Sequence, residues 1–108
     1  TITYCADGKC AIVWVTLDML KSLNIGEDEI EGLASIPRQI EGVLIGITMK
    51  EKEGGFFKIS VRTNGDIDAA KFCSKFGGGG HKAAAGCSIN GSLEDVRSQL
   101  IKAAEETL

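Results

Sequence analysis

The sequence lacks the residues that several common functional sites need. Its 108 residues include one histidine, and its four cysteines form no Cys-x-x-Cys pair, which excludes a Cys₂His₂ zinc site. No apolar run is long enough to cross a bilayer, and the first residues show neither the basic start nor the apolar core of a secretory signal. We therefore expect no membrane partner and a cytoplasmic location.

Positive charge is not in excess either. Twelve basic residues against 15 acidic residues give a net charge of −3, whereas a long nucleic-acid footprint needs many uncompensated lysines and arginines. A short nucleotide that is held by a few donors is compatible with this balance.

Length and composition predict one domain. A chain of 108 residues, 44% of them hydrophobic, suffices for one core over residues 1–108. The first residue is threonine instead of methionine, and we expect the chain to be the C-terminal fragment of a longer protein.

The cysteines fall into two kinds of surroundings. Cys5 and Cys10 flank the turn signal Asp7-Gly8 and can meet across a hairpin. We favour reduced thiols over a disulfide there, as is typical of cytosolic proteins. Cys73 and Cys87 lie among apolar residues and are predicted to be core residues.

Hydrophobic spacing predicts an α/β fold. The expected strands cover residues 1–5, 10–15, 43–49, 56–62 and 87–89, with a charged loop over 50–55. The expected helices cover residues 17–25, 27–34, 69–76, 81–85 and 93–108, and Pro37 interrupts the second of them. Asp68 and Ser92 are predicted N-caps. Together these elements predict a mixed β-sheet of about five strands with flanking helices.

The segment Phe76–Gly86 is the most informative part of the chain. Four consecutive glycines are costly to order, so a compact domain keeps them where the backbone needs unusual dihedrals or where something approaches closely. We interpret this run, Gly77–Gly80, as a connection between two helices whose free amides point into a common cavity. Such amides at a helix start bind anions.

Two side chains complete this predicted anion site. Arg62 ends the polar stripe of the 56–62 strand and offers a planar fork of donors that suits phosphate. His81, in the first turn of the helix expected over 81–85, can donate to a phosphate oxygen. The alternative is a flexible loop with a surface histidine and a solvated arginine. The narrow pattern Gly-Gly-Gly-Gly-His followed by alanines favours the ligand site.

The stretch Arg62–Gly86, which reads RTNGDIDAAKFCSKFGGGGHKAAAG, resembles the signature of the DHH-associated C-terminal domain. It is most similar to the version in DHH-family oligoribonucleases that also dephosphorylate phosphoadenosine phosphate. In that family a Ser-x-Arg-Ser strand end precedes Phe-Gly-Gly-Gly-Gly-His-x-x-Ala-Ala-Gly. Arg62 holds the arginine position here, and Thr63 replaces the usual serine but keeps a hydroxyl. The substrate-loop positions fall on Gly78, Gly79, Gly80 and His81.

The resemblance implies a division of labour. An N-terminal DHH catalytic domain would carry the Asp-His-His motif and two manganese ions, and this domain would hold a short oligonucleotide or nucleotide substrate. The chain has one histidine and no Asp-His-His motif, so we expect no catalytic residue, no metal and no cofactor in it. A homodimer is left open.

Related proteins provide the alternatives. A cyclic-dinucleotide phosphodiesterase shares the Gly-Gly-Gly-Gly-His loop, and a single-strand exonuclease uses a similar two-domain plan. A non-catalytic RNA-binding module, like the C-terminal domain of alanyl-tRNA synthetase, usually has arginine and a glutamine-containing stretch after the glycines. The continuation His81-Lys82-Ala83 favours the phosphoesterase.

Overall fold

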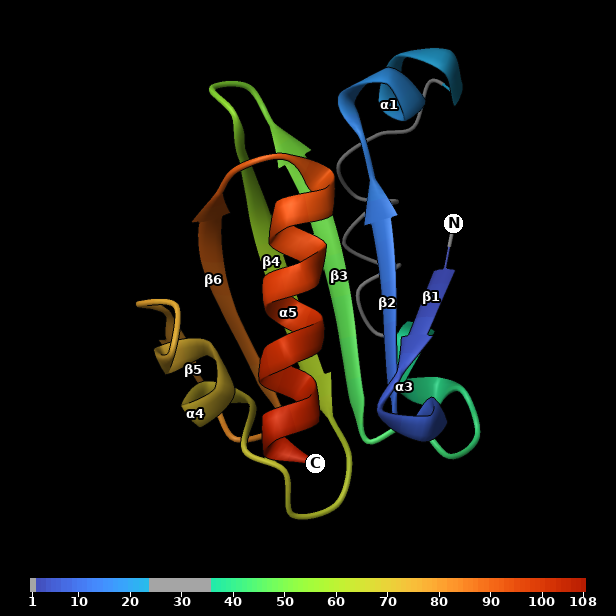
Figure 1. The fold of residues 1–108 in the computed structure, drawn as a ribbon, viewed down its shortest axis with the longest axis vertical. Helices are drawn as coiled ribbons and strands as arrows, with labels where there is room; N and C mark the ends of the chain where they lie inside the picture. Colours follow the sequence, from blue (N-terminus) through green and yellow to red (C-terminus); the bar gives the residue numbers. More distant parts are fainter. Residues whose placement is uncertain (1, 24–35) are drawn as a thin grey trace.

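The computed structural model describes residues 2–23 and 36–108, and the helix predicted over 27–34 lies outside them. Six strands form one mixed sheet in the order β1-β2-β3-β4-β6-β5 (Figure 1). β2 and β3 are parallel, and all other neighbours are antiparallel. The predicted class is therefore confirmed, with six strands in place of about five.

The described elements have the following bounds. The strands are β1 (Ile2–Cys5), β2 (Cys10–Val15), β3 (Ile45–Lys52), β4 (Phe56–Thr63), β5 (Gly79–Gly80) and β6 (Ala84–Asn90). The helices are α1 (Leu17–Leu23), α3 (Ile36–Gln39), α4 (Ala69–Ser74) and α5 (Leu93–Thr107), and a 3-10 turn at Ala6–Gly8 joins β1 to β2. Among the described residues, no helix combines the length and hydrophobicity that a membrane span requires.

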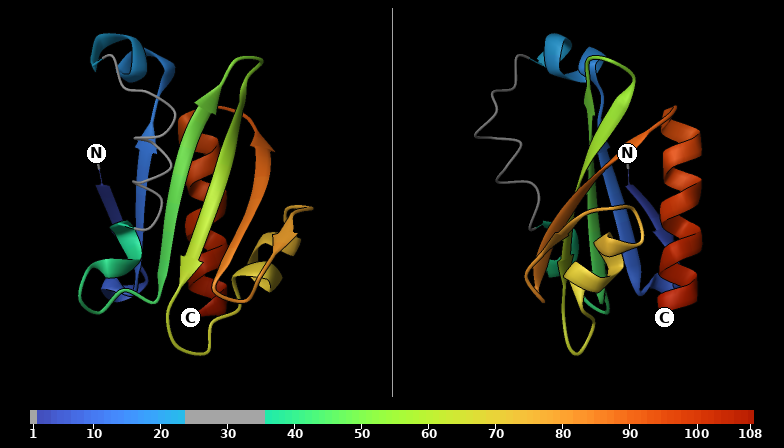
Figure 2. Two further views of the ribbon diagram at one scale, coloured as in Figure 1. Left: turned by 180° about the vertical axis from the view of Figure 1, so that it is seen from behind. Right: turned by 90° about the vertical axis from the view of Figure 1, so that its left-hand side faces the viewer.

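The core lies between the sheet and α5, which runs along one face of it (Figure 2). The alternation predicted for β4 is confirmed, because Phe57, Ile59 and Val61 are buried in this core. α5 contributes a buried stripe that includes Val96 and Leu100. The intervening residues of β4 therefore point to the opposite face of the sheet.

Helix α4 is fixed at both ends by local hydrogen bonds. Asp68 is its N-cap, as predicted, since its Oδ1 accepts the Lys71 amide at 3.1 Å. Past its end, the Gly77 amide donates to the Ser74 carbonyl at 3.1 Å, and the Gly78 amide donates to the Cys73 carbonyl at 3.0 Å. These two bonds, with a φ of +80° at Gly77, form a Schellman motif.

The expectation of a helix over 81–85 is wrong. The glycine run leads from α4 into a hairpin of β5 and β6, and Ala84 already belongs to β6. A short alanine-rich segment has little helical stability of its own. A strand forms here instead of a helix, because the alternation along β6 buries Ala85, Cys87 and Ile89 in the core.

The expected charged loop is shorter than predicted, and Pro37 lies at the start of a separate helix. Lys50–Lys52 extend β3 instead of forming a loop, because they continue the ladder with β4 up to Phe56. Pro37 lies in the first turn of the short helix α3, where the missing amide of proline costs no hydrogen bond.

We predict that Phe72→Ala lowers the free energy of unfolding by about 3–5 kcal/mol, because the ring is 2% exposed and its loss leaves a cavity. Phe76→Ala is the control, since its ring is only partly buried against the same core. Urea unfolding followed by circular dichroism measures both. Equal losses would contradict this difference in burial.

Candidate functional site

The fold itself accounts for three of the four consecutive glycines. Gly77 takes the positive φ that ends α4. A Cβ on Gly78 would overlap the Gly86 carbonyl and lie 2.8 Å from Cys87 Cα, and a Cβ on Gly80 would lie 2.7 Å from Ala85 Cα. Strand β6 therefore packs directly on the backbone of both glycines.

Gly79 is different from its neighbours. A Cβ placed on it would meet nothing within 4 Å, and its φ lies outside the left-handed region. Neither dihedral strain nor packing within the described residues explains a glycine there. A close approach by something outside the described residues is the explanation that remains among the reasons for keeping glycine.

The predicted cavity of free amides is not what the structure shows. The run connects a helix to a hairpin, and the amides of Gly77, Gly78 and His81 donate to the carbonyls of Ser74, Cys73 and Ala84. His81 and Ala84 exchange both backbone bonds, at 2.8 and 3.3 Å. Because an antiparallel ladder alternates, Gly80 turns its amide away from β6, toward the open edge of the sheet.

Arg62 and His81 lie on either side of one small residue. Arg62 is the register partner of Ala84 in β4 and β6, and His81 pairs with Ala84 across the hairpin. Residues opposite one another in a sheet point to the same face, and strands two apart are separated by about 10 Å. The two side chains therefore share the face opposite α5, with the Ala84 methyl between them.

The next set of cross-strand partners on the same face has even smaller side chains. Ser60 pairs with Gly86, and Gly86 pairs with Gly79. The surface between Arg62 and His81 is thus a floor of small residues with a hydroxyl at its border. The polar stripe of β4 was predicted from the sequence, but Ala84 and Gly86 were missed as floor residues because they were assigned to a helix and its end.

Arg62 and His81 differ in their exposure to solvent. Arg62 is partly buried, and its Nη1 donates to the Val61 carbonyl over 3.4 Å, a long bond that a better acceptor can replace. His81 is exposed at the end of the hairpin. Both can donate to an anion on the floor.

Thr63 is buried instead of lining the floor. It is 4% exposed, and its hydroxyl lies 2.8 Å from the Ile67 carbonyl and 3.1 Å from the Lys82 carbonyl. The Lys82 carbonyl also accepts the Ala69 amide at 2.6 Å. This set of bonds joins the turn after His81 to the end of β4 and the start of α4.

The thiols form two close pairs, and all four are free. Cys5 and Cys10 are register partners across the first hairpin, as the sequence predicted, and Cys73 and Cys87 lie in the core. Burial raises the pKa of the Cys5 and Cys10 thiols, and the hydrogen bond to Cys87 together with burial raises the pKa of Cys73. These three thiols are therefore protonated and unreactive near neutral pH.

No metal site is visible in the described part of the chain. No group of three or more His, Cys, Asp or Glu side chains lies close enough there to hold an ion. The floor between Arg62 and His81 offers donors to an anion and no carboxylate pair for a cation.

The DHHA1 domain family matches residues 7–108 of the chain. A curated relative, the bifunctional oligoribonuclease and PAP phosphatase NrnA of Thermus thermophilus, is 30% identical over 83 residues. The match covers 76% of this chain and 25% of that protein, so the chain spans a quarter of the length of the relative.

Two solved structures share the fold. An exopolyphosphatase-related protein from Bacteroides fragilis superimposes with a TM-score of 0.85 at 24% identity, over 98% of this chain and 32% of that one. The C-Ala domain of Aquifex aeolicus alanyl-tRNA synthetase gives a TM-score of 0.63 at 16% identity, over 100% of this chain and 97% of that one.

Gly78→Ala and Gly79→Ala form a matched pair. We predict that Gly78→Ala lowers the free energy of unfolding by about 2 kcal/mol, because its Cβ overlaps β6. Gly79→Ala should change it by less than about 0.5 kcal/mol, because its Cβ meets open space. Urea unfolding distinguishes them, and an equal loss would show that the fold needs glycine at both positions.

Proposed function

The chain belongs to the DHHA1 domain family, and from this premise we propose that it is the substrate-binding domain of a DHH-family phosphoesterase. The substrate is a short oligoribonucleotide or phosphoadenosine phosphate. The naming of the Thermus relative as an oligoribonuclease and PAP phosphatase supports this substrate class. The missing part of the enzyme is an N-terminal DHH catalytic domain.

The row Arg62–Ala84–His81 is the observation that carries the proposal. Two donors stand on one face of the sheet about two strand spacings apart, with a floor that has almost no side chains. A phosphate between them accepts from the guanidinium fork and from the imidazole, and the adjoining ribose or base lies over Gly79 and Gly86. The amide of Gly80 adds a donor at the open sheet edge.

The role of the domain in this proposal is to orient the substrate. Holding a phosphate in a fixed place brings the bond to be broken into position against the nucleophile that another domain provides. Thr63 acts as a positioning residue, because its hydroxyl faces two carbonyls in the interior. It fixes the turn that carries His81.

Manganese is assigned to the DHH domain because this chain does not fit it. The described residues contain no cluster of ligands, and the whole sequence contains one histidine. A two-metal hydrolytic centre needs several histidine and carboxylate ligands. We also place the enzyme in the cytoplasm, whose reducing conditions suit free thiols.

Binding of adenosine 5′-monophosphate tests the site. We expect Arg62→Ala and His81→Ala each to weaken it about tenfold or more, because each removes a charge-assisted donor to the phosphate. Arg62→Lys should rescue little, since an ammonium cannot replace the two-pronged fork. Titration followed by NMR chemical shifts gives the affinity, and Lys58→Ala, exposed on the same face of β4, is the control.

Unchanged affinity in both alanine variants would overturn the site. A chain that binds long structured RNA but no mononucleotide would instead favour the RNA-binding module, and preference for a cyclic dinucleotide would favour the corresponding phosphodiesterase.

We further expect no hydrolysis by this chain alone, with or without added Mn²⁺, because its described residues hold no group of ligands and its sequence has one histidine. The assay is release of mononucleotides from a short oligoribonucleotide, resolved by chromatography. Turnover that copurifies with the chain, and that disappears in His81→Ala, would contradict the division of labour.

A further inference from the structure

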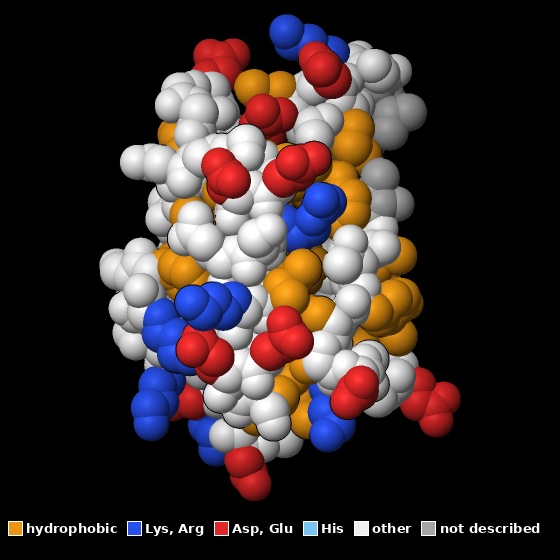
Figure 3. All heavy atoms as spheres, viewed as in Figure 1, with side chains coloured by type: hydrophobic (Ala, Val, Ile, Leu, Met, Phe, Trp, Pro, Cys, Tyr) orange, Lys and Arg blue, Asp and Glu red, His pale blue; other side chains and the backbone are white. Residues whose placement is uncertain are grey.

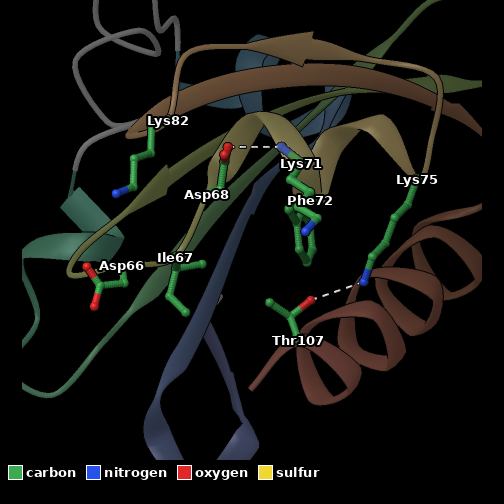
Figure 4. A pocket seen from close by; sticks show the side chains of 8 residues that line it. All are labelled: Asp66, Ile67, Asp68, Lys71, Phe72, Lys75, Lys82 and Thr107. Atoms are coloured by element: carbon green, nitrogen blue, oxygen red, sulfur yellow. Dashed lines mark hydrogen bonds between the residues drawn. The ribbon is translucent and has the colours of Figure 1, made fainter.

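A groove runs beside α4 on the helix side of the sheet. Its volume is about 420 Å³, within the range of small-molecule sites. Ile67 and Phe72 form its apolar base, and Lys71, Lys75 and Lys82 stand around it (Figure 4). We call it the lysine groove. In the space-filling view, basic side chains gather at the lower left, over α4 (Figure 3).

The three lysines form no ion pair with any carboxylate in the part of the chain that the structure describes. Lys71 and Lys75 are four residues apart at α4, a spacing at which like charges repel. Lys75 Nζ donates to Thr107 Oγ1 at 3.1 Å and lies 5.8 Å from the centre of the Phe72 ring. Among the described residues, the ammonium groups of Lys71 and Lys82 have no such contact.

Lys82 connects the groove to the floor on the other face. It follows His81 directly, and its backbone carbonyl is fixed by the Ala69 amide and the Thr63 hydroxyl. His81 shares the face of Arg62, whereas the Lys82 side chain lines the groove beside α4. The hairpin turn thus presents one donor to each side of the sheet edge.

We propose that the lysine groove binds a second phosphate of a single-stranded oligonucleotide whose first phosphate lies between Arg62 and His81. This inference rests on the proposed function and extends it to the length of the substrate. The strand passes over the β5–β6 turn, so that consecutive phosphates meet His81 and then Lys82 and Lys71.

The groove also contains two carboxylates, Asp66 and Asp68, whose negative charge should act on phosphate binding in the direction opposite to the lysines. Asp68 is occupied as the N-cap of α4. Asp66, which is exposed, lines the groove without such a structural bond in the described residues, and its charge opposes a phosphate there. Removing the Asp66 charge should therefore strengthen binding, while removing lysine charges weakens it.

The test compares a fluorescein-labelled pentaribonucleotide with adenosine 5′-monophosphate on this chain. For Lys71→Gln combined with Lys82→Gln, we expect about three- to tenfold weaker pentaribonucleotide binding. The slope of log affinity against log salt should fall by about 1.4, because two contacts to a single strand are lost. Mononucleotide affinity should stay unchanged. Asp66→Asn should increase pentaribonucleotide affinity.

The control is Lys9→Gln combined with Lys21→Gln, which removes the same charge from exposed positions outside the groove. Equal pentaribonucleotide affinity and salt slope in the two double variants would overturn the lysine groove. So would failure of the unaltered chain to bind the pentaribonucleotide. Loss of mononucleotide binding on Arg62→Ala with no effect of the groove lysines would reject this inference and leave the proposed function standing. No effect of Arg62→Ala or His81→Ala on either ligand would reject the proposed function.

Discussion

One carbonyl oxygen, that of Lys82, holds together the part of the molecule that we assign to function. It accepts the first amide of α4 and lies within reach of the buried Thr63 hydroxyl. Through it the β5–β6 turn is fixed to both a helix and a strand that come earlier in the chain. Together with the bond from the Thr63 amide to the Ala83 carbonyl, this link fixes the turn that carries His81 and the Lys82 side chain.

The consequence is a site built on rigid elements with little side-chain material of its own. Arg62 stands near the end of β4, an interior strand of the sheet, and the glycines of β5 and β6 contribute backbone alone. The fold needs Gly77, Gly78 and Gly80 for its own geometry, whereas the described residues impose no such need at Gly79. Under the proposed function, Gly79 is therefore the glycine of this run that a ligand approaches.

The sequence predicted the elements whose signals are local. The hairpin at Asp7-Gly8, the alternation of Phe57, Ile59 and Val61, and the N-cap at Asp68 all depend on near neighbours. The first half of β6 was not recognised as a strand because Ala84 and Ala85 are the same residue type and show no alternation in hydrophobicity. Its burial is decided by β4 and the helices, which come from distant parts of the chain. The hydrogen bond between the Lys82 carbonyl and the Ala69 amide likewise has no local signal in the sequence. The structure therefore has a hairpin and a flat floor in place of the predicted cavity of glycine amides.

Strand β5 closes the sheet with two residues and no side chains. An unpaired strand border normally invites another chain to add to it and can nucleate aggregates. A border of two glycines is too short to template such pairing, yet it leaves one backbone donor accessible to a small solute. The brevity of β5 therefore limits the pairing surface at this edge to two residues, while the Gly80 amide faces the open edge of the sheet.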